Sequence, residues 1–307
     1  MNCTRTVRRS WRTTWQACLN RWGLVIAALA ALAAAVNAAE PVWTITEGIG
    51  APSHPLYDPD SNSLFVTQIS GVGDEKDGVG VVSRLDLNGN MLDVEWISGL
   101  DAPKGIARQG TTLWVSDIDR LHRIDSRTAE IEESLDVPDA KFLVGTAVDS
   151  QGTVYVADML ASKIHQYRDK RFAVYVAGDA LESPAGLVVA ADRLIVAAWG
   201  LTDDYTTEVP GRFIAIEKRK SRPISQAVGN LYGLVSDGAK GWLGTDFTTG
   251  RVLHVTETKE PRELLRLSKG IGGIEFVTSR QLLIVTEVTE NRISAFDLAP
   301  MLKSKSQ

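Results

Sequence analysis

One short strand pattern recurs six times along this 307-residue chain. Each copy is a run of apolar residues that, in most copies, ends in a small residue followed by an acid, as in TLWVSD and GTVYVAD. The copies recur at intervals of 40 to 49 residues and end at Gln68, Asp117, Asp158, Ala198, Asp246 and Glu287. Self-similarity at a fixed period is typical of repeat architectures, in which each repeat forms one structural unit.

Each unit contains further strand signals around the recurring one. A short strand precedes it and opens with glycine in five units, as in Gly105-Ile106 and Gly186-Leu187. An amphipathic strand such as KIHQYR follows, then a fourth strand in most units, with turn residues between them. Because six units of four strands carry no convincing helical period, the sequence predicts an all-β fold, a six-bladed β-propeller.

The sixth unit runs out of residues before a fourth strand can form. The segment PVWTITE at 41–47, ahead of the first unit, can supply that strand. We therefore expect the mature N-terminal strand to close the ring, which leaves no unpaired sheet edge.

The first 38 residues are predicted to be a secretory signal peptide. A basic leader with no acid precedes the apolar run 24–36, which is too short to cross a bilayer comfortably. Val36 and Ala38 place small residues before a cleavage site, so residues 39–307 form one mature domain. We expect the protein in the periplasm or secreted, with an uncleaved anchor as the alternative.

Export changes the composition of the mature chain. Both cysteines, Cys3 and Cys18, lie in the leader, so disulfides and a thiol nucleophile are excluded from the mature domain. Loss of five arginines leaves 28 basic against 38 acidic residues, a net charge of about −10. An acidic exported protein is a poor candidate for binding nucleic acid or an anionic membrane.

Two units are longer than the others, and the extra residues lie in equivalent places. The insertions 71–80 and 200–211 both fall between the second and third strands of their units, hence on one face of the disc. These units, the first and the fourth, are opposite each other in a ring of six. The insertions therefore predict a functional rim around one channel mouth, with acidic side chains at Asp74, Asp77, Asp203 and Asp204.

Four stretches carry a resemblance to a known family: YDPDSNSLFVT, GLDAPKGIA, LWVSDIDRL and GTVYVADMLASKI. They resemble the gluconolactonase, senescence marker protein and luciferin-regenerating enzyme group of six-bladed propellers, and the last also resembles an NHL-type blade. The resemblance implies hydrolysis of sugar lactones by a divalent metal at the channel mouth. It also implies that a Glu in the first blade, and an Asn and an Asp in later ones, hold that metal at the start of the innermost strands.

The metal-ligand positions are not retained in this sequence. The positions that the resemblance assigns to the mouth are Ser53, Lys104, Val144, Ala185, Tyr232 and Gly272. None is a carboxylate, whereas a calcium ion needs several oxygen ligands. The sequence therefore predicts no bound metal and no cofactor.

Other residues near the mouth are candidate binding groups. Trp199 and Tyr232, together with Lys104, suggest an aromatic and cationic pocket for a small anionic or polar ligand. His54 lies next to Ser53, but adjacent strand residues point to opposite faces, so we expect the two side chains not to meet. Glu275 is the one candidate acid or base in the channel.

The acids that end the recurring strands have a structural interpretation. Because they are repeated, we expect Asp117, Asp158, Asp246 and Glu287 to accept hydrogen bonds from backbone N–H groups of nearby turns.

Two main functions follow from these patterns, besides metal-free chemistry of the strictosidine-synthase-like kind, which would need Glu275 as its acid or base. The first is an exported binding or accessory module that recognises a small molecule or a periplasmic protein at the channel mouth. The alternative is a metal-dependent hydrolase of sugar or related lactones, with calcium or zinc held by Asp74, Asp77, Asp203 or Asp204.

Overall fold

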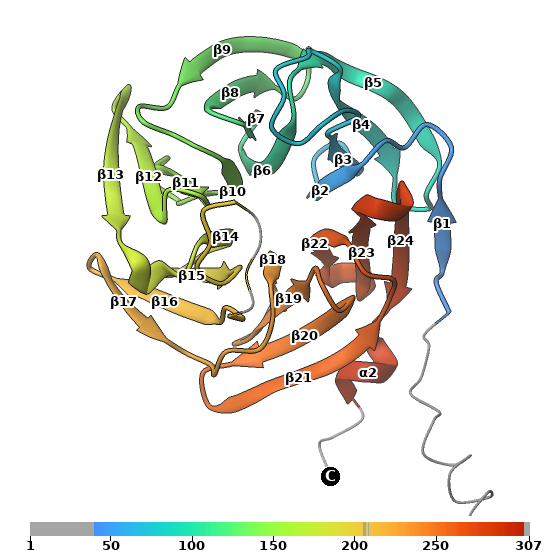
Figure 1. Ribbon diagram of the computed structural model, residues 1–307. Helices are drawn as coiled ribbons and strands as arrows, with labels where there is room; N and C mark the ends of the chain where they lie inside the picture. Colours follow the sequence, from blue (N-terminus) through green and yellow to red (C-terminus); the bar gives the residue numbers. More distant parts are fainter. Residues whose placement is uncertain (1–39, 205–206, 208, 304–307) are drawn as a thin grey trace, which may run out of the picture. The chain divides into compact units, whose positions relative to one another are not determined.

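The structure is a computed structural model that describes residues 40–303 except 205, 206 and 208. The signal peptide predicted over residues 1–38 lies outside the described residues. The remainder forms six four-stranded antiparallel sheets around a central axis, as the sequence predicted (Figure 1).

In the first five blades the strands run outward from the axis in chain order, and in the sixth blade the outermost strand comes from the N-terminal side of the chain. The first three blades are β2 (Pro52–Asp58), β3 (Ser63–Gln68), β4 (Gly80–Asp86) and β5 (Met91–Leu100); β6 (Pro103–Gln109), β7 (Thr112–Asp117), β8 (Arg120–Asp125) and β9 (Glu130–Asp136); β10 (Leu143–Val148), β11 (Val154–Asp158), β12 (Lys163–Arg168) and β13 (Arg171–Ala177). The last three are β14 (Pro184–Ala190), β15 (Arg193–Ala198), β16 (Phe213–Glu217) and β17 (Lys220–Pro223); β18 (Leu231–Ser236), β19 (Trp242–Asp246), β20 (Arg251–Thr256) and β21 (Lys259–Arg266); β22 (Ile271–Val277), β23 (Leu282–Glu287), β24 (Arg292–Asp297) and β1 (Trp43–Ile45).

The N-terminal strand β1 completes the sixth blade. It pairs antiparallel with β24, with Trp43 opposite Ala295 and Ile45 opposite Ile293. The indole Nε1 of Trp43 also donates a hydrogen bond of 3.0 Å to the carbonyl of Leu87 in the first blade. The predicted closure of the ring is thus confirmed, and β1 links the sixth blade to the first.

The core lies between neighbouring blades. Leu64 and Val66 of the first blade pack with Ile284 of the sixth, for example, and all three are fully buried. The second strands are buried on both faces, which explains their unbroken apolar runs. A short helix, α2 (Ala299–Lys303), follows the last strand and packs Met301 against the fifth and sixth blades. Among the described residues, no helix has the length and apolar character needed to cross a membrane.

Each innermost strand opens with a register shift and passes very close to the next blade. A Cβ on Gly105 would lie 2.1 Å from the carbonyl oxygen of Val144, and a Cβ on Gly145 would lie 2.1 Å from that of Ala185. Only glycine permits so close an approach of two backbones. In the first blade, His54 occupies the equivalent position, and we call this level of the ring, where neighbouring inner strands approach so closely, the waist.

Hydroxyl groups of the recurring strands connect neighbouring blades. Thr67, Ser116 and Thr245 donate to the carbonyls of the mouth residues Lys104, Val144 and Gly272 in the next blade, at 2.6, 2.5 and 2.6 Å. Thr286 donates to the carbonyl of Ser53 at 2.7 Å and so joins the sixth blade to the first. The small residue of the motif therefore has a structural role.

The acids of the motif are structural as well. The Asp117 carboxylate accepts the backbone N–H groups of Asp101 and Ala102 at 2.7 and 2.6 Å, and Asp158 accepts two others at 3.0 Å each. These two confirm the expected backbone contacts. Asp246 and Glu287 differ, because they pair with arginine side chains on the third strands of their own blades, Arg251 and Arg292.

Candidate functional site

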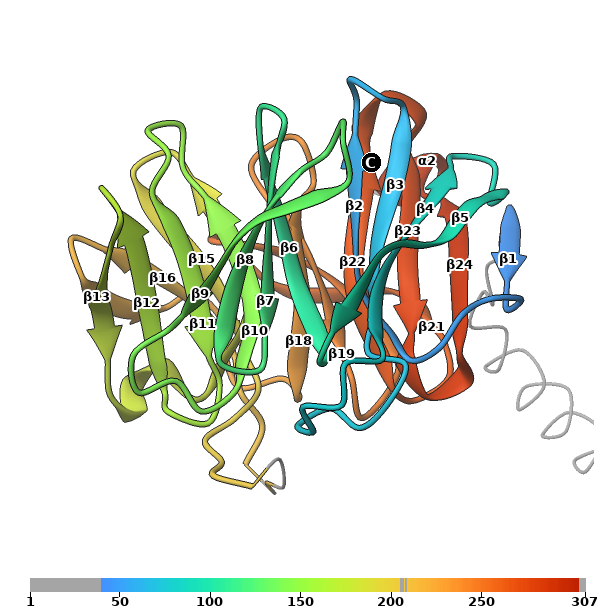
Figure 2. The ribbon, with the colours of Figure 1, turned by 90° about the horizontal axis from the view of Figure 1, so that it is seen from above.

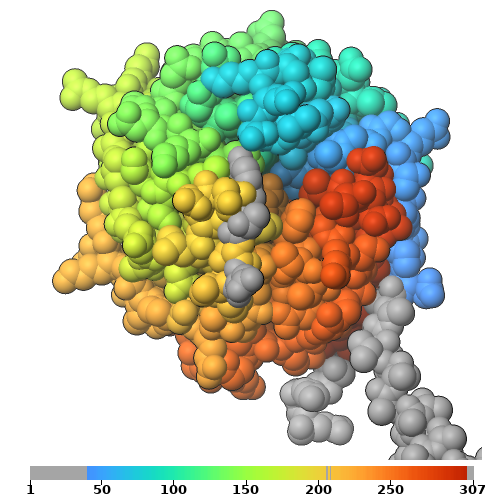
Figure 3. Space-filling view, in the orientation of Figure 1, coloured from blue at the N-terminus to red at the C-terminus, as the bar shows by residue number. Residues whose placement is uncertain are grey.

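The two long loops lie on the same face of the disc, which we call the loop face (Figure 2). The β3–β4 loop and the β15–β16 loop belong to the first and fourth blades, which are opposite each other in the ring. Both are on the face turned to the viewer in the space-filling view (Figure 3). The four acids predicted at this rim are exposed: Asp74, Asp77, Asp203 and Asp204.

Lys104 lies buried beneath the β3–β4 loop. Its side chain is 1% exposed, and its amine donates hydrogen bonds to the carbonyls of Gly73 in the loop and Ala102, at 2.7 and 2.9 Å. The amine also lies 4.2 Å from the ring centroid of Phe142. Burial lowers the pKa of Lys104 to about 8, although the charges of Asp117 and Asp74 act in the opposite direction.

Ser53, His54 and Tyr232 form a hydrogen-bonded chain across the mouth. The Ser53 hydroxyl lies 3.1 Å from Nδ1 of His54 and 3.2 Å from the Tyr232 hydroxyl. The prediction that Ser53 and His54 do not meet was wrong. The register shift between Pro52 and Pro55 interrupts the alternation of side chains, so the two neighbours point to a common region.

The other mouth residues pack into one buried cluster. Trp199 and Tyr232 have ring centroids 6.3 Å apart, and both lie against Phe247 at 5.3 and 5.9 Å. The buried members are Phe142, Val144, Met159, Ala185, Trp199 and Tyr232. The side chains expected to form an aromatic and cationic pocket are therefore brought together, but as packed and not open groups.

The mouth offers few metal ligands. Across the part of the chain that the structure describes, there is no group of three or more His, Cys, Asp or Glu side chains that could hold a metal ion. The mouth positions themselves carry an amine, hydroxyls and apolar groups.

On the other side of the waist the channel holds a cavity of about 230 Å³, which we call the axial cavity. Every innermost strand contributes to its wall, mostly with apolar side chains. One residue per blade at the same level shows this composition: Leu56, Ala107, Ala147, Val188, Val235 and Glu275. His54, Thr146 and Arg108 also line it.

Glu275 is the acidic side chain in this wall. Its two carboxylate oxygens accept the backbone N–H groups of Tyr57 and Phe276 at 3.1 and 2.8 Å. Burial nevertheless raises the pKa of Glu275 to about 7, because two amide hydrogen bonds replace only part of the lost hydration.

Two polar atoms of residues that line the axial cavity lack partners. The Thr146 hydroxyl and Nε2 of His54 are buried and have no hydrogen-bond partner among the described residues. Burial lowers the pKa of His54 to about 4, so its ring is neutral at pH 7. Arg108, in contrast, is ion-paired with Asp58 at 2.8 Å and with Asp60. A mainly apolar cavity with a few polar groups and a perturbed carboxyl is typical of a small-molecule site.

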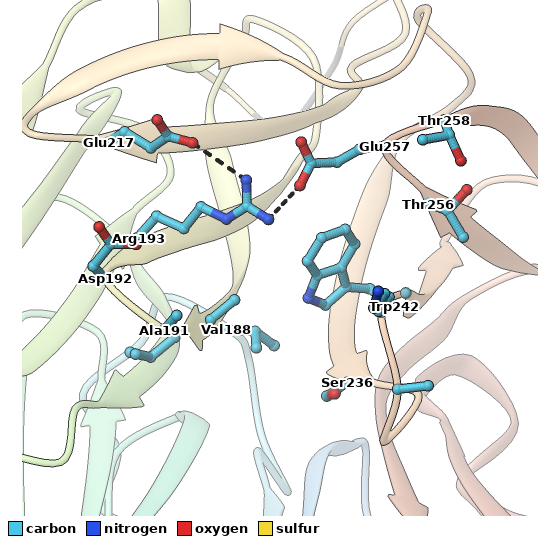
Figure 4. Close-up of a pocket in the computed structure, with 15 residues that line it drawn as sticks. Val188, Ala191, Asp192, Arg193, Glu217, Ser236, Trp242, Thr256, Glu257 and Thr258 are labelled. Carbon is cyan, nitrogen blue, oxygen red and sulfur yellow. Dashed lines mark hydrogen bonds and ion pairs between the residues drawn. The ribbon is translucent and has the colours of Figure 1, made fainter.

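A larger cavity of about 800 Å³ lies between the fourth and fifth blades (Figure 4). Arg193 pairs there with Glu217 at 3.2 Å and with Glu257, and its guanidinium lies 5.8 Å from the ring centroid of Trp242. Because the charges of Arg193 and the two glutamates compensate one another, we interpret these contacts as a structural link between the fourth and fifth blades.

Comparison with solved structures identifies similar folds. Virginiamycin B lyase from Staphylococcus aureus aligns with a TM-score of 0.59 and 12% identity, over 83% of this chain and 98% of that chain. A streptogramin B lyase structure gives 0.58 and 12%, over 82% and 96%. A nidogen/laminin complex gives 0.55 and 15%, over 71% and 90%. No family model and no curated protein sequence matches.

At these identities the likeness shows the fold alone: the chain is a six-bladed β-propeller. Proteins described as lyases and a protein from a binding complex share it. The gluconolactonase resemblance is supported no further than this common architecture.

Sequence reasoning named Glu275 and His54 separately and missed the axial cavity that joins them. The sequence does contain a pattern that indicates this cavity. Placing the innermost strands in register aligns Glu275 with five apolar residues, and His54 with five glycines.

Proposed function

We propose that this protein is an exported binding or accessory module and not a metal-dependent lactone hydrolase, and that it binds a partner protein through the loop face. The observation that carries the proposal is Lys104, whose buried amine occupies the mouth where the resembling family holds its metal.

The Lys104 ammonium group at this position argues against the binding of a divalent metal ion there. A buried ammonium group repels a divalent ion, and calcium needs six to eight oxygen ligands. The neighbouring mouth positions supply hydroxyls at Ser53 and Tyr232 and otherwise apolar groups. The amine instead supports the β3–β4 loop, because one of its hydrogen bonds ends on Gly73.

The loop face favours a protein over a small molecule. Its central side chains are packed, whereas the acids of both loops are exposed. A partner with a basic surface would complement these acids, and the net charge of the mature chain would steer its approach. We place both proteins in the periplasm or outside the cell, on the strength of the predicted signal peptide.

The hydrolase alternative has less support. Its ligands would come from Asp74 and Asp77 in one loop and Asp203 and Asp204 in the other, and the two loops belong to opposite blades. Purified mature protein should contain no stoichiometric calcium or zinc by mass spectrometry and should not hydrolyse a panel of sugar and aromatic lactones. Lactone turnover that a chelator abolishes would overturn the proposal.

Partner capture tests the binding surface directly. A variant with Asp74, Asp77, Asp203 and Asp204 all changed to Asn should recover less of its partner from a periplasmic extract than the wild type. A variant matched in charge, with four exposed acids of the outer strands β5 and β9 neutralised, should capture it fully: Asp93→Asn, Glu95→Gln, Glu130→Gln and Glu132→Gln. Equal capture by both variants would exclude the loop face.

A further inference from the structure

The axial cavity holds a charge that its own wall does not neutralise. Among the described residues that line it, the ionisable side chains are Glu275, His54 and Arg108. Arg108 forms ion pairs with Asp58 and Asp60, and His54 is neutral at pH 7. Above pH 7 the carboxylate of Glu275 therefore has two backbone N–H groups and no cationic partner in this wall.

We propose that the axial cavity binds a small organic ammonium ion, with the amine on the Glu275 carboxylate and an apolar body against the inner-strand side chains. Each carboxylate oxygen accepts one backbone N–H and has a further lone pair for the ligand. An ammonium group would supply the missing countercharge in a low-dielectric site, where a charge-assisted hydrogen bond is strong.

The rest of the wall fits the remainder of such a ligand. Leu56, Ala107 and Val188 present apolar surface from three blades. The unpartnered hydroxyl of Thr146 offers one additional hydrogen bond to a polar substituent. At about 230 Å³ the cavity has the volume of roughly eight water molecules in the liquid, so the ligand is compact, with one ring or a short chain.

This site is independent of the proposed partner surface. The loop face and the axial cavity are on opposite sides of the waist that His54 and the inner-strand glycines form. Loss of partner capture and loss of amine binding are therefore separate results.

Titration calorimetry of the purified mature protein at pH 8 tests the proposal with three probes of one shape: benzylamine, benzyl alcohol and benzoate. We expect benzylamine to bind at least about tenfold more tightly than benzyl alcohol, and benzoate not to bind, because only the amine carries the complementary charge. Failure of benzylamine to bind at millimolar concentration, or equal affinity for all three probes, would overturn the site.

Two variants locate the binding. Glu275→Gln should lower the ratio of benzylamine affinity to benzyl alcohol affinity by at least about tenfold. Glu130→Gln, the same change on the exposed strand β9, should leave this ratio unchanged. If Glu275→Gln does not fold, Ala147→Leu narrows the cavity and keeps the carboxylate, and it should abolish benzylamine binding. Unchanged benzylamine affinity in the folded variant that is tested would refute the proposal.

Discussion

Lys104 is a buried amine whose hydrogen bonds end on two backbone carbonyls, one of them in the β3–β4 loop. The pKa of Lys104 is lowered because the cost of burying the ammonium group exceeds its favourable interaction with the charges of Asp117 and Asp74. At the scale of the residue, the main consequence is therefore the position of a loop and not overall stability.

Lys104→Met tests that interpretation. We expect the free energy of unfolding at pH 7 to change by less than about 2 kcal/mol, because relief of the buried charge offsets the loss of two hydrogen bonds. Endoproteinase Glu-C should cleave after Glu75 several-fold faster, since the loop loses its contact at Gly73. Lys141→Met, at an exposed lysine of the β9–β10 loop, is the control. Equal cleavage of the Lys104→Met variant and the wild type would contradict this role.

Glu275 makes stability depend on pH in the opposite sense to an ordinary carboxylate. Its pKa is about 7 in the folded protein and near 4.5 when unfolded, so the folded state binds more protons between these values and stability falls as pH rises. The full cost, up to about 3 kcal/mol, is present above pH 7. His54 acts oppositely, because its lowered pKa makes stability rise between about pH 4 and 6.5.

Comparison with Glu275→Gln isolates the carboxyl. The stability of the variant relative to the wild type should increase from pH 4.5 and level off above pH 7, by about 1–3 kcal/mol. Urea unfolding at a series of pH values measures this difference. A difference that stays constant with pH would mean that Glu275 keeps its ordinary pKa in the folded protein.

At the scale of the element, the second strands connect the blades through their hydroxyl groups. Thr286→Val leaves the carbonyl of Ser53 without its buried donor and should lower the free energy of unfolding by about 1–3 kcal/mol. Thr128→Val, at an exposed turn, should change it by less than about 0.5 kcal/mol. Similar values for the two variants in denaturant unfolding would show that the link between the sixth and first blades contributes little.

The closing strand β1 is only three residues long, yet it completes a blade. For a chain that begins at residue 48, the free energy of unfolding should fall by about 3 kcal/mol or more, because this chain loses the β24 pairing and the partly buried Trp43. The exposed edge of β24 should also promote association, seen by size-exclusion chromatography. A chain that begins at residue 42 keeps β1 and should behave as the wild type. Monomeric, fully stable protein without β1 would contradict the closure role.

The sequence was sufficient to predict the elements because their spacing is regular. Apolar runs at intervals of 40 to 49 residues specify the blades, and the strand-like segment 41–47 ahead of the first unit predicts the closing strand. Side-chain directions at the mouth were not predictable in this way. The register shift at Pro52 turns Ser53 and His54 together, and no pattern of residue types reveals a bulge of that kind.

Whether a channel is open or packed depends on more than one strand. Trp199 and Tyr232 pack against each other and against Phe247, and these ring contacts join side chains of separate blades. The axial cavity needs six strands in register before Glu275 can be seen as a charge in an apolar wall. Such properties belong to the assembled ring and not to any local segment.

At the scale of the whole molecule, charge governs the proposed partner binding. Because the acids of the loop face are exposed, affinity for a captured partner should fall several-fold between about 50 and 500 mM salt. The variant with the four loop aspartates changed to Asn should bind weakly with little dependence on salt. Surface plasmon resonance measures both, and salt-independent binding by the wild type would point to an apolar interface.

The pairing of β1 with β24 joins the first described strand to the last one. Synthesis that stops before residue 292 leaves Trp43 and its neighbours without the strand that they pair with. The ring can therefore close only after β24 has been made, so the sixth blade is completed late, when the rest of the propeller is already present.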